Sequence, residues 1–435
     1  MATPVEAFQA AVGIGDVERV RALLSEHADV RAAVNDPIAE FGSRPIAVAR
    51  KNLPLLDVLL EFGADLNLKS TWWAGGFGVL EESSPDEAAA LIERGAIVDI
   101  FAAAHLGMFD RVRSLVSADP SLVHARGGDG KTALHWAVSV DIARYLLDHG
   151  AALEARDVDH ESTAAQYLVR DAPAVTRFLI GRGATVDIFM AVGLNDAALV
   201  ERCLRDDPEA LDHRTWHGKY SVAHNGARPA TPEEIGDRRG DYYRWVFGHN
   251  LSALDVAAQL GDDQILSLLI AHASPVQRLL AACVRSDRSA AEGVLADHPD
   301  LIRDLTPDQR CLMPDRAHAN DTASVALMLD LGFDPLWPGV DDAEAIRWAA
   351  FQGNAEMTRL LLRHAPPINV RDRRYQGTLL GWCVYGALHG WRRTTGDFAT
   401  TARLLIEAGE HVDPGLTPTG SGDLDDVLGR GPRRG

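Results

Sequence analysis

The segment from Asp129 to Asp157 sets a pattern that most of the chain repeats. Its sequence, DGKTALHWAVSVDIARYLLDHGAALEARD, predicts a tight turn at Asp129-Gly130 and a short apolar helix over 133–138. A second helix is expected over 141–149 and ends at Gly150, because glycine readily adopts a left-handed cap. A helix pair this short cannot bury its own apolar face. The chain is therefore expected to form a row of such pairs, each leaning on its neighbours.

Two stretches of this segment resemble the ankyrin repeat. TALHWA at 132–137 matches the T-P-L-H-x-A signature, and LLDHGA at 146–151 matches the leucine-pair, glycine and alanine ending. The resemblance, to a divergent family of bacterial type with an inserted loop, implies an all-α ankyrin-repeat solenoid of about 11–12 helix-turn-helix repeats, some with short β-hairpin fingers. In that family the signature histidine, here His135, bridges backbone groups of adjacent turns.

The pattern divides the chain into four parts. Ankyrin-like repeats are expected over 1–215 and 251–415, and they are separated by an inserted loop over 216–250. The segment 416–435 is rich in Gly, Pro, Asp and Arg and has little to bury, so it is expected to be disordered.

Composition excludes several classes of function. A formal net charge of -19 argues against nucleic acid and anionic membrane surfaces as partners. Neither a signal peptide nor a membrane span is predicted, and we expect a soluble cytoplasmic protein. The sequence contains no H-E-x-x-H, no paired cysteines and no calcium loop, so no metal site and no cofactor is predicted.

The insertion 216–250 is the main candidate binding surface, because solenoids place insertions in loops that often line the binding face. Arginine and aromatic side chains are enriched at protein-binding hot spots, and arginine also suits anionic small ligands. Three interpretations stay open: a hairpin held by its own aromatics, a protein-binding loop, and a small-molecule site. The candidate binding residues are Trp216, Tyr220, Arg238, Arg239, Tyr242, Tyr243, Arg244 and Trp245.

A second cluster of similar composition contains His389, Trp391 and Arg392. It is expected in a turn between helices, on the rim opposite the insertion, so the two clusters are not expected to form one site. Three tryptophans occupy the same position in three repeats. Large rings at such positions usually pack against the next repeat, which favours packing over a ligand-binding ladder. These tryptophans are Trp136, Trp348 and Trp382.

Two functional hypotheses follow. The first is a protein–protein interaction scaffold that binds a partner through its concave face and the insertion 216–250. The alternative is a small-molecule enzyme of lyase, isomerase or hydrolase type, with the insertion as a lid over a groove. Its candidate acids and bases are His217, His224 and His249. A deep pocket lined by these groups would favour the enzyme, and an open groove would favour the scaffold.

Overall fold

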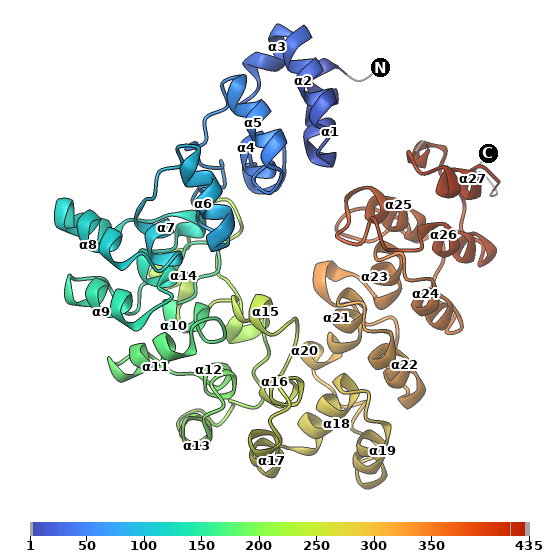
Figure 1. The fold of residues 1–435 in the computed structure, drawn as a ribbon. Coiled ribbons are helices and arrows are strands. Elements are labelled where there is room, and N and C mark those ends of the chain that lie inside the picture. The colour runs from blue at the N-terminus through green and yellow to red at the C-terminus, as the bar shows by residue number, and fades with distance from the viewer. Residues whose placement is uncertain (1–2, 418, 431–435) are drawn as a thin grey trace. The chain divides into compact units, whose positions relative to one another are not determined.

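The computed structural model describes residues 3–417 and 419–430, which form successive pairs of short helices (Figure 1). Extended structure in these residues is reduced to isolated antiparallel bridges at the turns between repeats, among them Ala39–Ser43, Arg156–Thr163 and Pro338–Glu344. The all-α repeat architecture with short hairpin fingers is thereby confirmed. About twelve repeats are present in the described residues, in agreement with the expected number.

The chain divides into two compact units. The first contains Met1–Leu194 and Gly218–Val246, and the second contains Asn195–His217 and Phe247–Gly435. Most of the insertion therefore belongs to the first unit, while its two ends belong to the second.

Most repeats of the first unit contribute an inner helix and an outer helix. One repeat, that of α6 (Pro85–Glu93), has a loop in place of the inner helix, and α3 (Ala28–Ala32) is a short extra turn. The pairs are α1 (Pro4–Ile14) with α2 (Val17–Glu26), α4 (Pro45–Val48) with α5 (Leu53–Glu61), α7 (Ile100–His105) with α8 (Phe109–Ala118), η4 (Ala133–Trp136) with α9 (Val140–Asp148), and α10 (Ala164–Tyr167) with α11 (Pro173–Gly181). The inner helix α12 (Ile188–Gly193) follows them.

The second unit begins with α13 (Ala197–Asp206) and continues after the insertion. Its pairs are α16 (Ala253–Gln259) with α17 (Asp263–His272), α18 (Pro275–Val284) with α19 (Arg288–Asp297), α21 (Leu312–His318) with α22 (Thr322–Leu331), α23 (Ala345–Phe351) with α24 (Ala355–Leu362), and α25 (Leu379–His389) with α26 (Phe398–Glu407).

The repeat signature has the expected structural role at His135. Its Nδ1 accepts a hydrogen bond from the backbone N–H of Thr132 at 3.1 Å, and its Nε2 donates to the carbonyl of Ser162 at 3.2 Å. Burial lowers the pKa of His135 to about 3, so the ring is neutral and can serve as acceptor and donor at once. The helix that begins after Thr132 is a single turn ending at Trp136, shorter than the predicted 133–138.

The C-terminal segment was expected to be disordered, and this expectation is wrong for residues 422–430. They form helix α27 (Gly422–Arg430), and its Leu424 and Leu428 are buried in the core of the second unit. Leucines four residues apart lie on one face of a helix, so even this polar segment has an apolar stripe to dock. Residues 418 and 431–435 of that tail lie outside the described residues.

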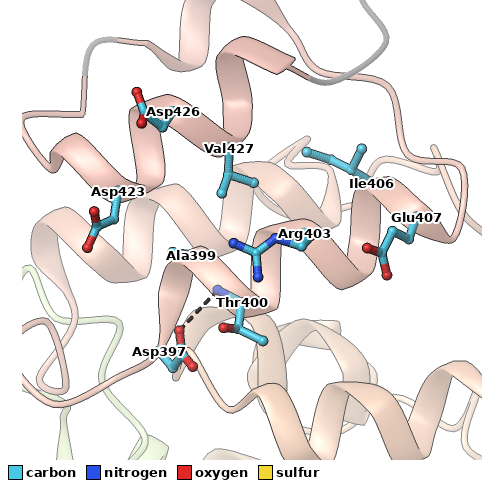
Figure 2. Close-up of a pocket in the computed structure, with 9 residues that line it drawn as sticks. All are labelled: Asp397, Ala399, Thr400, Arg403, Ile406, Glu407, Asp423, Asp426 and Val427. Carbon is cyan, nitrogen blue, oxygen red and sulfur yellow. Dashed lines mark hydrogen bonds between the residues drawn. The ribbon is translucent and has the colours of Figure 1, made fainter.

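Docking of α27 leaves a pocket of about 540 Å³ between it and α26 (Figure 2). Exposed charged side chains line much of it, namely Arg403, Glu407, Asp423 and Asp426. Such an exposed, charged lining is typical of a solvated crevice beside a terminal helix.

Candidate functional site

Two buried tyrosines fix the insertion to the first unit. Tyr220 and Tyr243 both pack on Phe189, with ring centroids 4.8 and 5.5 Å away. The Tyr243 hydroxyl donates to the carboxylate of Asp187 at 3.0 Å. Asp187 also accepts from the N–H of Met190 and so caps α12. Tyr220 and Tyr243, predicted as binding residues, therefore hold the loop in place and do not face solvent.

A short stretch of the insertion docks on the turn that precedes α10. The N–H of Asp241 donates to the carbonyl of His160 at 2.9 Å, and the N–H of Tyr242 donates to Ser162 Oγ at 3.2 Å. Gly240 has a φ of 77°, and a Cβ there would overlap Ser162 Oγ. Glycine is thus required at position 240 both for the backbone conformation and for this close approach.

An earlier stretch of the insertion docks on the same turn. The carboxylate of Glu161 accepts from the N–H groups of Ala223 and His224, at 2.9 and 3.1 Å. The His224 Nε2 lies 2.6 Å from the carbonyl oxygen of Asp159, and its ring packs 4.8 Å from that of Trp73. His224, a candidate acid or base in the sequence, is thus engaged in docking the loop.

The predicted arginines of this region also help to dock it. The carbonyl of Arg238 accepts from the Arg156 guanidinium at 2.7 Å, and that of Arg239 accepts from Gln166 Nε2 at 2.9 Å. The guanidinium of Arg238 itself donates to the carbonyl of Glu234 at 2.8 Å.

The docked insertion completes a pocket of about 650 Å³ within the first unit. At its edge Trp245 is 61% exposed, and Arg244 lies over the Trp245 ring at 4.9 Å. Aromatic rings from the repeats and the insertion make up much of the lining: Phe41, Trp72, Trp73, Phe77, Tyr242 and Trp245. The ionisable side chains in the lining are Arg50, Glu82, Asp129, Lys131, Asp159, His160 and Arg244.

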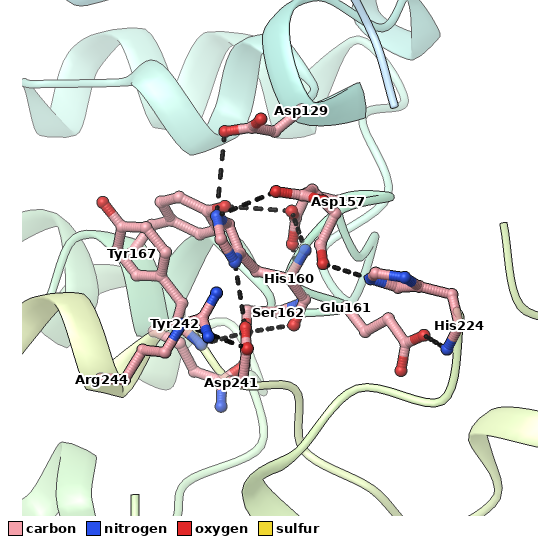
Figure 3. Close-up of polar contacts among 12 residues, drawn as sticks. Asp129, Asp157, His160, Glu161, Ser162, Tyr167, His224, Asp241, Tyr242 and Arg244 are labelled. Carbon is pink, nitrogen blue, oxygen red and sulfur yellow. Dashed lines mark hydrogen bonds and ion pairs between the residues drawn. The ribbon is translucent and has the colours of Figure 1, made fainter. Parts of the chain in front are cut away.

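His160 is the centre of the polar part of this pocket. Figure 3 shows Asp129 and Asp241 on opposite sides of its ring. The Nδ1 lies 2.9 Å from Asp241 Oδ1, while Nε2 lies 3.5 Å from Asp159 Oδ2 and 3.9 Å from Asp129 Oδ2. Burial tends to lower the pKa of His160, but the hydrogen bond to Asp241 and the charges of Asp157, Asp241 and Asp159 outweigh it. The pKa is raised as a result.

Two cations balance part of this negative charge. Lys131 Nζ lies 3.3 Å from Asp129 Oδ2 and 3.9 Å from the centroid of the Trp136 ring. Arg244 Nε lies 3.3 Å from Asp241 Oδ2. The sequence predicts a turn at Asp129-Gly130, but it does not indicate a site at Asp129, Lys131 or His160, because no metal-binding or catalytic motif includes these residues.

The remaining candidate histidines belong to the second unit. His217 Nε2 lies 2.9 Å from Asp315 Oδ2, and the His249 ring packs 4.7 Å from that of Trp216. His224 belongs to the first unit, so the three candidate imidazoles do not lie within one compact unit.

The two sequence clusters were expected on opposite rims, and the second unit corrects this. The ring of His318, at the end of α21, lies 4.7 Å from His249 and 5.2 Å from Trp391. It also packs edge-to-face on Trp348 at 4.4 Å. One end of the insertion and the predicted Trp391 thus meet at a histidine that the sequence did not indicate.

Near this contact the second unit has an aromatic pocket of about 500 Å³. Trp348 and Trp382 are buried and packed edge-to-face at 5.2 Å, which agrees with the predicted packing role. Of the predicted cluster, Trp391 lines the pocket, His389 is exposed and packs on Tyr385 at 4.6 Å, and Arg392 is half-buried. The lining residues are Asp341, Trp348, Phe351, Tyr375, Gly377, Gly381, Trp382, Tyr385 and Trp391.

Among the described residues, no helix combines the length and the apolar content that crossing a bilayer requires.

Comparison with known proteins identifies part of the chain. The family model described as "Ankyrin repeats (3 copies)" matches residues 100–190. A curated relative, the palmitoyltransferase akr1 of Schizosaccharomyces pombe (strain 972 / ATCC 24843), is 41% identical over 59 residues. That match covers 13% of this chain and 9% of the relative.

Among solved structures, one chain of the complex of the predatory endopeptidase Bd0816 from Bdellovibrio bacteriovorus with immunity protein Bd3460 is 23% identical. The match covers 41% of this chain and 98% of that one, with a TM-score of 0.27. Ankyrin repeats in general serve as scaffolds for protein interaction. The family match and the repeat geometry agree that residues 100–190 are ankyrin repeats.

Proposed function

We propose that this chain is a protein-interaction scaffold and that its first unit binds a partner protein at the pocket beside the insertion. The observation that carries this proposal is the position of Trp245. It is 61% exposed at the edge of the pocket, on an insertion held by the buried side chains of Tyr220 and Tyr243.

An exposed tryptophan on a fixed support suits protein recognition. Tryptophan, tyrosine and arginine dominate binding hot spots, because each buries a large area and also offers a directed polar group. The Arg244 guanidinium lies over the face of the Trp245 ring, and the Tyr242 ring stacks on that of Tyr167 at 3.5 Å. These contacts order both rings before a partner binds. A partner would therefore lose little affinity to the ordering of this surface.

The shape and chemistry of the pocket define what the partner would supply. Its aromatic lining suits a large apolar side chain of the partner. The second unit offers a further surface of this kind, where Trp391 and Tyr385 are 60% and 59% exposed at the aromatic pocket. Binding through the concave face of the repeats remains part of the proposal.

The enzyme alternative has less support. His224 contacts the Asp159 carbonyl, and His217 contacts Asp315, so each imidazole already has a structural partner. His224 belongs to the first unit, whereas His217 and His249 belong to the second.

The experiment is a comparison of W245A with the control I14A. Ile14 is 80% exposed in the same unit and does not line the pocket. Proteins retained by the full chain from an extract of its own cells are identified, and the affinity of the purified partner is measured by calorimetry. We expect W245A to weaken binding by about 10-fold or more and I14A to leave it unchanged. Equal affinities for the wild type and W245A would contradict the proposal.

A further inference from the structure

A histidine and two carboxylates converge within the first unit, in the pocket that the insertion completes. His160 Nε2 and one oxygen each of Asp129 and Asp159 all lie within 4.8 Å of one another. The Nε2 is 3.5 and 3.9 Å from the nearest oxygens of Asp159 and Asp129. Two ligands bound at about 2.1 Å to a tetrahedral ion are separated by about 3.4 Å. These spacings thus leave room for an ion between the three groups after small side-chain adjustments.

The imidazole is held in the orientation that a metal ligand requires. The side chain of His160 is buried, with 9% of it exposed, and Nδ1 is 2.9 Å from Asp241 Oδ1. In histidine metal sites the ring nitrogen away from the ion typically donates to a carboxylate, which fixes the tautomer and makes the ligating nitrogen more basic. Asp241 occupies that position here, and Figure 3 shows it across the ring from Asp129.

The backbone keeps the two carboxylates close together. The N–H groups of Val158 and Asp159 both donate to the carbonyl of Asp129, at 2.8 and 3.2 Å. The carboxylate of Asp157 accepts from the N–H of His160 at 2.7 Å and from that of Ser162 at 2.7 Å, which closes the turn. These hydrogen bonds hold the turns of two successive repeats together. The backbone therefore already places the three side chains close enough to bind one ion.

We propose that Asp129, Asp159 and His160 bind a divalent transition-metal ion, with Zn²⁺ as the representative ion and Asp241 as the residue that positions the imidazole. Mixed imidazole and carboxylate ligands suit such an ion better than Mg²⁺, which prefers oxygen ligands and retains water. Three protein ligands leave a fourth position, and these residues line the pocket, so that position faces it. This inference goes beyond the proposed partner binding and does not depend on it.

Lys131 is the group that competes with the ion. Its ammonium lies 3.3 Å from Asp129 Oδ2, the same oxygen that faces His160. A bound ion would displace the ammonium from this oxygen and weaken its contact. Removing the positive charge should therefore strengthen metal binding, since like charges a few ångströms apart repel strongly in a buried site. Methionine retains the apolar contact of Lys131 with the Trp136 ring.

The test is the Zn²⁺ affinity of the full chain after treatment with a chelator, measured by competition with a chromophoric indicator. We expect one tight site, an affinity loss above about 100-fold in H160A and about 10- to 100-fold in D159N and D241N. The control H298A removes an exposed histidine and should bind as the wild type does. K131M should bind Zn²⁺ about 10-fold more tightly.

Circular dichroism establishes that each variant is folded, and D159N replaces H160A if the latter is not. X-ray absorption of the Zn²⁺ complex should show nitrogen and oxygen ligands at about 2.0–2.2 Å and no sulfur. The proposal is overturned if the wild type binds no Zn²⁺, or if H160A and D159N bind it within about twofold of the wild type. Unchanged or weaker binding by K131M would likewise count against this ligand set.

Discussion

The hydroxyl of Tyr243 donates to the carboxylate of Asp187 at 3.0 Å, and this contact joins the insertion to the N-cap of α12. The two residues are 56 positions apart in the chain. Tyr243 is 1% exposed and Asp187 is 9% exposed, so water cannot readily replace either partner. The insertion is consequently an integral part of the first unit, and the pocket that it completes has a fixed wall.

Loss of this contact should loosen the insertion. Tyr243→Phe leaves the buried Asp187 carboxylate with one donor fewer, and we expect the free energy of unfolding to fall by about 1–3 kcal/mol. Trypsin should also cleave faster after Arg238 and Arg239. Urea denaturation and timed proteolysis measure the two effects. The control Tyr385→Phe removes the hydroxyl of a tyrosine that is 59% exposed. An equal loss of stability in both variants would contradict the anchoring role of Tyr243.

Two glycines of α25 should respond in opposite ways to alanine. A Cβ at Gly386 would overlap the carbonyl oxygen of Phe351 on α23, whereas a Cβ at Gly381 would approach only Thr378 Oγ1, at 3.6 Å. We expect Gly386→Ala to destabilise the protein by about 1–3 kcal/mol. Gly381→Ala should be neutral or stabilising by up to about 1 kcal/mol, because alanine favours helix. Melting temperatures that rank the variants the other way would show that these helices do not pack closely at Gly386.

His135 should make stability depend on pH in the acid range. Burial lowers its pKa in the folded state to about 3, below the ordinary 6.5, so the unfolded chain binds more protons between these values. Its contribution to stability is complete above pH 6.5 and is lost as the pH falls toward 3, at up to about 1.4 kcal/mol per pH unit. The free energies of unfolding of the wild type and of His135→Asn, measured by denaturation at a series of pH values, should therefore converge at low pH. A difference between the two free energies that stays constant from pH 7 to 4 would contradict this prediction.

The terminal helix should contribute to the stability of the second unit. Leu428 is fully buried in the core of that unit, and its truncation in Leu428→Ala should cost about 2–5 kcal/mol. Asp426→Ala changes an exposed residue of the same helix and should have little effect. Chemical denaturation of both variants checks this, and a loss below about 0.5 kcal/mol for Leu428→Ala would mean that α27 is not stably docked.

The repeat elements could be predicted from the sequence because their signals are local. The signals recur from repeat to repeat: a capping residue such as Thr132, an apolar helix, and a glycine such as Gly150. In the segment 129–157 the predicted helix boundaries lie within one or two residues of the observed ones. The apolar stripe of α27 was missed, because Leu424 and Leu428 stand among residues typical of disorder.

The pocket could not be predicted in the same way. His160 and Asp241 are 81 positions apart, and a motif search sees only residues that are close in the chain. The length and composition of the insertion mark it as a departure from the repeat pattern, but they do not separate the tyrosines that anchor it, Tyr220 and Tyr243, from Tyr242, which lines the pocket. The sequence did not indicate His318, because its ring contacts come from residues distant in the chain: Trp348 on α23, and His249 and Trp391 in loops.

Site-specific photo-crosslinking tests most directly whether the pocket edge is the binding surface. A photoreactive phenylalanine derivative replaces Trp245 in one full-length variant and Ile14 in another, and both are irradiated in extract of the cells from which the chain comes. We expect one major crosslinked protein at position 245, which excess wild-type chain suppresses and which is absent at position 14. Equal crosslinking at both positions, or none at position 245, would contradict it.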